Sequence, residues 1–157
     1  MVTAAMADWS SRTPLTFVAR TNQALVDRLS GLGVPIAAVE VCMHHPDGGE
    51  GGEASLVGPC ECRKPKPGLL IRAMRALGAT PEGTWMIGDS PADVGAAAAA
   101  GVRSALLFAE NRCELCPLRG GPEHLPGPKP TIWAPRLDRL AEALLRADDA
   151  RGAAPVR

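Results

Sequence analysis

Short apolar runs alternate with amphipathic segments along this chain, and this alternation limits the folds that are open to it. Runs of roughly four to eight apolar residues are typical of buried strands, whereas apolar residues at helical spacing indicate covering helices. Strands that alternate with helices predict an α/β fold with a parallel sheet, in which ligands bind at the carboxyl ends of the strands. The predicted strands are "VPIAAVEVC", "TWMIGDS" and "RSALLFA", and the predicted helices are residues 14–32, 67–78, 91–101 and 135–147.

The composition is that of one ordinary globular domain. Of 157 residues, 46% are hydrophobic, and 17 basic residues balance 17 acidic ones, so net charge does not favour nucleic acid or an anionic membrane. No long apolar span or signal peptide occurs, so we expect a cytoplasmic protein whose five cysteines are metal ligands or free thiols. We expect a single domain over residues 14–147, with disordered ends at residues 1–13 and 148–157.

Three cysteines and a histidine form the clearest chemical pattern. Cys42 and His44 make a C-x-H pair, and fifteen residues further on Cys60 and Cys62 make a C-x-C pair. Three thiolates and one imidazole complete the tetrahedral shell of a closed structural zinc site, and the glycine-rich loop between the pairs would be closed by the metal. The pattern therefore predicts structural zinc at these four residues. The alternatives are His45 in place of His44, or ordinary thiols beside a chance histidine.

A basic pair follows the last of these cysteines. Arg63 and Lys64 lie between the predicted zinc ligand Cys62 and Pro65, so both side chains should be held in place. A guanidinium and an ammonium fixed in this way suit a phosphate group. The alternative is a solvated basic pair.

A second pair of cysteines occurs near the carboxyl end. Cys113 and Cys116 form a C-x-x-C pair, and His124 lies eight residues further on. The pattern lacks a fourth ligand. It leaves three interpretations open: a second metal site, a redox pair or unreactive loop thiols.

The segment "IGDSPADVG" carries two carboxylates at a strand end. It places Asp89 at the carboxyl end of a predicted strand and Asp93 four residues later, in the first turn of a helix. A carboxylate at the mouth of the sheet can hold Mg²⁺ through a hard oxygen ligand. The same segment also suits a helix cap, with Asp89 or Ser90 at the N-cap and an acidic side chain favoured by the helix dipole.

Together these motifs resemble a known family. "CMHHP", "CECRKPKPGLL" and "WMIGDSPADVGAAAAAGV" resemble the haloacid-dehalogenase-like (HAD) phosphatases of subfamily IIIA, the heptose bisphosphate and histidinol phosphate group, over roughly residues 15–107. The resemblance implies a HAD-like Rossmannoid parallel sheet with helices on both faces, and zinc in the loop at the four predicted ligands. It further implies that Lys64 stabilises an aspartyl-phosphate, that Arg63 contacts the substrate and that Asp89 holds Mg²⁺. Ser90 stands where heptose enzymes often have a lysine.

One motif of that family does not occur. The nucleophile and the acid/base of these enzymes come from an Asp-x-Asp segment on the first strand, and this chain contains no Asp-x-Asp. Asp8 is the only acid before the first predicted helix, and Thr21, which imitates the second motif, fits better inside that helix. We therefore expect that the amino-terminal strands are missing. The chain would then be marginally stable, homo-oligomeric or completed by a partner that supplies the strands.

Two functions follow from these expectations. The first is a phosphatase that hydrolyses a phosphate monoester of a small sugar or amino alcohol, such as heptose 1,7-bisphosphate, through an aspartyl-phosphate. Because the nucleophile motif is absent, the sequence leaves open whether this chain is itself an enzyme. The second is a catalytically inactive, zinc-stabilised module that binds a phosphorylated ligand or a partner protein through Arg63 and Lys64. In the first case the expected partner is a small phosphorylated metabolite, and in neither case is it nucleic acid or a membrane.

Overall fold

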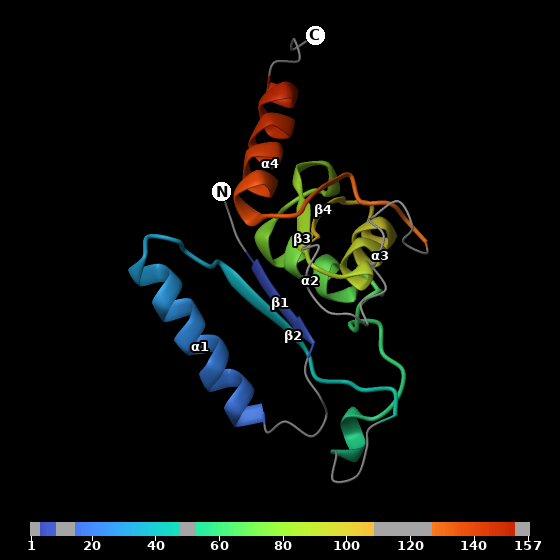
Figure 1. The fold of residues 1–157 in the computed structure, drawn as a ribbon. Helices are drawn as coiled ribbons and strands as arrows, with labels where there is room; N and C mark the ends of the chain where they lie inside the picture. The colour runs from blue at the N-terminus through green and yellow to red at the C-terminus, as the bar shows by residue number, and fades with distance from the viewer. Residues whose placement is uncertain (1–3, 9–14, 48–52, 109–126, 153–157) are drawn as a thin grey trace. The chain divides into compact units, whose positions relative to one another are not determined.

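The computed structural model describes residues 4–8, 15–47, 53–108 and 127–152, and it divides into two compact units, Met1–Thr80 and Pro81–Arg157 (Figure 1). The sequence analysis expected a single domain, whereas each unit here holds a parallel sheet of its own. The strands alternate with helices along the chain, which confirms the predicted α/β class.

The first unit is a two-stranded parallel sheet with two helices. Its helix α1 (Leu15–Gly31) connects β1 (Ala4–Asp8) to β2 (Ala38–Cys42). After β2 a short 3₁₀ helix, η1 (Ala54–Leu56), leads to α2 (Gly68–Leu77), which packs on β2. The predicted helix around Thr21 is therefore confirmed.

Strand β1 corrects the expectation that residues 1–13 lack regular structure. It pairs with β2 in a register that runs from Ala4 opposite Ala38 to Asp8 opposite Cys42. The sequence of β1, "AAMAD", contains no β-branched or aromatic residue, so local propensity gives no strand signal. Backbone hydrogen bonding to β2 outweighs that weak propensity.

The second unit is a three-stranded parallel sheet in the order β3-β4-β5. Two parts of it differ from the prediction: β5 occurs in a segment expected to be irregular, and α4 extends through residues 148–152, which were expected to be disordered. A short apolar stretch in a Pro/Gly-rich segment gives little strand signal by itself. The elements are η2 (Pro81–Gly83), β3 (Trp85–Gly88), α3 (Pro91–Ala100), β4 (Arg103–Leu107), β5 (Ile132–Ala134) and α4 (Leu137–Gly152).

Helices cover both faces of this second sheet. On one face Leu106 packs against Val94 of α3. Ala105 and Leu107, its neighbours along β4, pack in the cluster around Leu140 of α4. Because successive side chains of a strand point to opposite faces, α3 and α4 lie on opposite faces of the sheet, as predicted.

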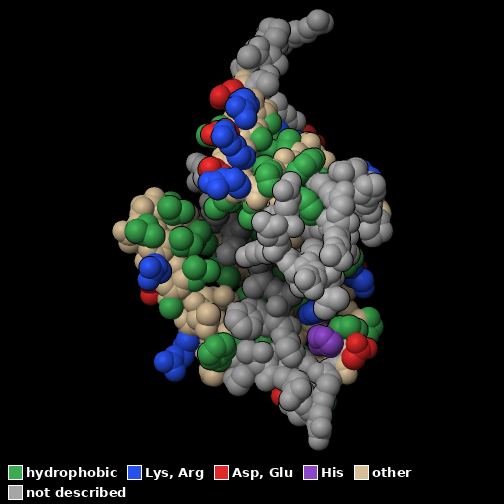
Figure 2. Space-filling view, in the orientation of Figure 1, with side chains coloured by type: hydrophobic (Ala, Val, Ile, Leu, Met, Phe, Trp, Pro, Cys, Tyr) green, Lys and Arg blue, Asp and Glu red, His purple; other side chains and the backbone are tan. Residues whose placement is uncertain are grey.

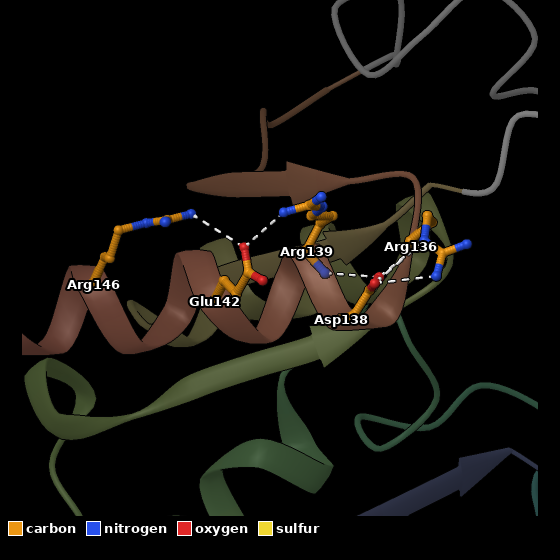
Figure 3. Close-up of polar contacts among 5 residues, drawn as sticks. All are labelled: Arg136, Asp138, Arg139, Glu142 and Arg146. Atoms are coloured by element: carbon orange, nitrogen blue, oxygen red, sulfur yellow. Dashed lines mark hydrogen bonds and ion pairs between the residues drawn. The ribbon is translucent and has the colours of Figure 1, made fainter.

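Charged side chains form a row along the outer face of α4 (Figure 3). Arg136 and Asp138 are 3.1 Å apart, and Glu142 lies 3.1 Å from Arg139 and 3.9 Å from Arg146. All five side chains are largely exposed, so solvent screens these pairs and they contribute little to stability. Mixed blue and red side chains mark this row in Figure 2. Within the described residues, no helix is both long and apolar enough to cross a membrane.

Candidate metal centre

The four predicted zinc ligands come together in the first unit. Sulfur and imidazole nitrogen atoms of Cys42, His44, Cys60 and Cys62 all lie within 4.8 Å of one another. Cys42 is the last residue of β2, and Cys60 and Cys62 lie in the loop that precedes α2. The two halves of the cluster are therefore brought together by the packing of α2 on β2.

The spacing of these atoms fits a tetrahedral metal. Zinc bonds of about 2.3 Å to sulfur and about 2.0–2.1 Å to nitrogen place the ligand atoms roughly 3.5–3.8 Å apart. The sulfur of Cys42 lies 3.2 Å from that of Cys62 and 3.8 Å from that of Cys60, and Nδ1 of His44 lies 3.4 Å from the sulfur of Cys62. A donor set of three thiols and one imidazole at these distances can hold zinc.

His44, and not His45, completes the donor set. Nδ1 of His45 accepts a hydrogen bond from the backbone of Asp47 at 3.2 Å. The backbone of His45 bonds to the segment after η1, donating to Leu56 and accepting from Gly58. The second histidine thus helps to close the loop, while the ring of His44 lies among the three thiols.

The cluster also forms the core of its unit. Cys42 and Cys62 are 0% and 7% exposed, and they pack with Leu69 of α2 and with Cys60. Glu40 and the carbonyl of Val41, at the end of β2, accept hydrogen bonds from Arg72 of α2 at 2.8 and 3.2 Å. A metal at this position would therefore join β2 to α2 where few other apolar contacts do so.

Burial sets the protonation of the thiols. Burial, together with the hydrogen bond that Cys42 shares with Cys62, raises the pKa of Cys42 to about 12, and burial also raises the pKa of Cys62. Burial acts in the same direction on Cys60, but the backbone N–H groups of Arg63 and Cys62 and the neighbouring thiols lower its pKa overall. Metal binding must therefore displace protons from at least Cys42 and Cys62.

The segment after Cys60 folds into a tight turn that the sequence analysis did not foresee. The amide of Gly68 donates to the carbonyl of Glu61 at 2.9 Å, and Lys66 forms an ion pair with Glu61 at 2.9 Å. A side chain at position 68 would collide with the Glu61 carbonyl and its carbon. Glycine is required here by close packing of two backbone segments, for which the sequence carries no signal beyond the residue itself.

The basic pair lies within this turn. The carbonyl of Arg63 accepts from the backbone of Lys66 at 3.0 Å, and its guanidinium donates to the carbonyl of His44 at 3.0 Å. Arg63 and Lys64 are both half-buried. They are therefore ordered side chains beside the metal centre, and the alternative of a loosely solvated pair does not describe Arg63.

In the second unit, the capping interpretation of "GDSPAD" applies to Ser90 and Asp93. Ser90 is the N-cap of α3, and its hydroxyl accepts from the amide of Asp93 at 3.3 Å. Oδ2 of Asp93, which is 4% exposed, accepts from the amides of Asp89 and Ser90 at 3.1 Å each and from the Ser90 hydroxyl at 2.7 Å. The side chain of Asp89 takes no part in this capping box and is exposed at the carboxyl end of β3.

Gly88 makes room for this arrangement. A Cβ atom at position 88 would collide with the carboxylate of Asp93. Asp93 can therefore reach back to the amide of Asp89 only because glycine precedes that residue. The carboxylate of Asp89 offers the hard oxygen donor that Mg²⁺ prefers.

Some predicted residues lie outside this description. Cys113, Cys116 and His124 fall outside the described residues, so the three interpretations of that segment stay as predictions. Asp8 is described as the last residue of β1, with its backbone opposite Cys42.

Comparison with known proteins agrees with the motifs. Residues 61–113 match the model of the HAD-hydrolase-like family. Two curated relatives are D-glycero-beta-D-manno-heptose-1,7-bisphosphate 7-phosphatases, from Yersinia pestis (38% identical) and Pasteurella multocida (33% identical), each over 79 residues. These alignments cover 50% of this chain and 40% and 41% of the relatives, so the chain spans about two fifths of the length of the proteins it matches.

A solved structure shares the fold. It is the D,D-heptose 1.7-bisphosphate phosphatase from B. bronchiseptica, crystallised with magnesium and phosphate, and it superposes with a TM-score of 0.68. The match covers 92% of this chain and 74% of that chain at 24% sequence identity, which shows a common fold. The predicted HAD-like resemblance is confirmed.

Proposed function

We propose, on the premise that residues 61–113 place this chain in the HAD-hydrolase-like family, that it contributes to the hydrolysis of a small phosphate monoester. The substrate class we favour is a phosphorylated sugar such as heptose 1,7-bisphosphate, on which the named relatives act. One observation carries the proposal: the Cys-His cluster closes directly on the turn that presents Arg63 and Lys64.

Each charged residue of the site would have its own role in this reaction. Lys64 would bind the phosphoryl group and stabilise its developing negative charge. Arg63 would contact the substrate through its guanidinium, whose planar fork suits a phosphate group. Asp89 would hold Mg²⁺, which when bound supplies neutralisation of phosphate charge. Zinc at Cys42, His44, Cys60 and Cys62 would be structural, because four protein ligands leave no open position.

A second candidate function is supported by one feature of the sequence. The chain contains no Asp-x-Asp, so the attacking aspartate that the family resemblance implies has no evident counterpart. A zinc-stabilised module that binds a phosphorylated ligand or a partner protein would need Arg63 and Lys64 but no nucleophile. The capping box that holds Asp89 at a strand end favours the phosphatase, because a binding module has no use for a magnesium carboxylate.

The test is phosphate release by the purified, zinc-loaded chain with Mg²⁺, using heptose 1,7-bisphosphate and histidinol phosphate. Turnover that is lost in Asp89→Ala would support the phosphatase. Ligand binding without turnover, lost in Lys64→Ala, would support the binding module. Absence of both from a folded protein would refute both candidates.

Two further expectations belong to this proposal. A cytoplasmic location is favoured by the use of cysteines as metal ligands. A role in carbohydrate metabolism follows only if the sugar phosphate is the substrate. We would repeat the phosphate-release assay across protein concentration to test whether the chain acts alone, as a homo-oligomer or with a partner.

A further inference from the structure

Arg63 connects the two arms of the metal centre. One arm is the Cys42–His44 segment at the end of β2, and the other is the Cys60–Cys62 segment before α2. From the second arm, the backbone amide of Arg63 donates to the sulfur of Cys60 at 3.4 Å. From the same residue, a guanidinium nitrogen donates to the carbonyl of His44, on the first arm, at 3.0 Å.

Both bonds act on metal ligands. The bond to Cys60 restricts the direction of a ligand sulfur, and the bond to His44 fixes the backbone from which the imidazole projects. Partners of this kind commonly change metal affinity by about 10–100-fold when they are removed.

Charge acts in the same direction. A centre of three thiolates, a neutral imidazole and one Zn²⁺ carries one net negative charge. The half-buried guanidinium of Arg63 lies beside that centre and stabilises its negative charge. Removal of the guanidinium should therefore weaken metal binding and not only the metal-free fold.

We propose that Arg63 is a positioning residue of the metal centre, which locks the two ligand arms together and in the same step fixes the turn that carries Lys64. The inference rests on the zinc site of the proposed function, but it does not depend on phosphatase activity. It differs from a role as substrate contact alone, because a residue that touches only substrate would leave metal affinity unchanged.

The test measures zinc affinity of the full chain by competition with a chromophoric chelator, for Arg63→Ala and Arg63→Lys. Lys66→Ala is the matched control, because it removes one positive charge from the same turn, where Lys66 contacts the exposed Glu61. We expect a 10–100-fold loss for Arg63→Ala, a smaller loss for Arg63→Lys, which keeps the charge but not the planar fork, and a change within about twofold for the control. The absorption bands of the Co²⁺-loaded protein should shift in Arg63→Ala and not in Lys66→Ala.

Two results distinguish a failure of the role proposed for Arg63 from a failure of the metal centre itself. If zinc affinity of Arg63→Ala stays within twofold of the parent while Cys60→Ala abolishes binding, Arg63 has no positioning role and the metal centre stands. If Cys60→Ala also binds zinc as the parent does, the metal centre is refuted and this inference with it. Should Arg63→Ala fail to fold, Arg63→Lys decides the question by the same twofold criterion.

Discussion

Replacement of Gly68 by alanine tests the close packing of Gly68 on Glu61, because that packing predicts a loss of stability where helix propensity alone predicts a gain. Gly68 is the first residue of α2, and in most helices a change from glycine to alanine adds about 0.5–1 kcal/mol of stability. Here the new methyl group would collide with the backbone carbonyl of Glu61. Because the obstacle is backbone, no side-chain rotation can relieve the collision.

The size of the change in the free energy of unfolding follows from the separation of the Gly68 and Glu61 segments that the new methyl group requires. Separating the two segments weakens the 2.9 Å hydrogen bond from Gly68 to Glu61, a loss of about 0.5–1.5 kcal/mol. Strain from overpacking adds about 1–3 kcal/mol. After the gain in helix propensity is subtracted, the free energy of unfolding should fall by about 0.5–4 kcal/mol. Since Glu61 lies between Cys60 and Cys62, zinc affinity should fall as well.

The assay is urea denaturation of the zinc-loaded protein, followed by circular dichroism, with Gly31→Ala as the control. Gly31 is the last residue of α1, and a Cβ atom there would meet nothing within 4 Å. We expect Gly31→Ala to be neutral or slightly stabilising and Gly68→Ala to be destabilising. The reasoning is refuted if both changes stabilise the protein, or if Gly68→Ala binds zinc as tightly as the parent.

Four further predictions concern separate features. Asp93→Asn keeps the shape of the side chain but removes the charge on the oxygen that accepts three hydrogen bonds. This change should lower the free energy of unfolding by about 1–3 kcal/mol. It should also weaken Mg²⁺ binding, and both effects can be measured by calorimetry. Zinc affinity should rise by at least about two decades per pH unit between about pH 6 and 8, because zinc displaces protons from at least the two thiols of raised pKa, and a pH-independent chelator competition would contradict this. In the metal-free protein the raised pKa of Cys42 gives stability that is complete below about pH 9 and lost as the pH rises toward 12, so alkaline unfolding should begin earlier without zinc. Asp148→Ala should lower the thermal midpoint by about 2–6 °C, because it removes the partner of Trp85 at 3.0 Å and of Arg103 at 3.1 Å and so loosens α4 from the sheet.

The sequence predicted those features that depend on residue types and their spacing within short segments. The zinc ligands are identified by residue type and spacing alone, and the structure brings all four together. The α/β class follows from periodicity, and it is confirmed. Ser90 is the N-cap of α3, and it is one of the two residues that the sequence analysis offered for that position.

The features that the sequence did not predict depend on contacts between distant segments. Strand β1 has no strand propensity of its own and exists through its pairing with β2. The bond from Arg63 to the carbonyl of His44 joins residues nineteen apart, and no pattern of residue types reports a bond to a backbone carbonyl. The need for glycine at positions 68 and 88 likewise depends on what lies opposite each Cα atom.

The same comparison shows how the two loops hold their reactive side chains. Lys64 and Asp89 are the residues with chemistry, and bonds or close contacts of other residues help to shape both loops: those of Arg63 and Gly68 in the first, and those of Gly88 and Asp93 in the second. Replacement of Lys64 or Asp89 should therefore abolish function at little cost in stability, whereas replacement of the supporting residues should reduce both. A chain in which Lys64→Ala and Gly68→Ala had equal effects on folding would contradict this division of roles.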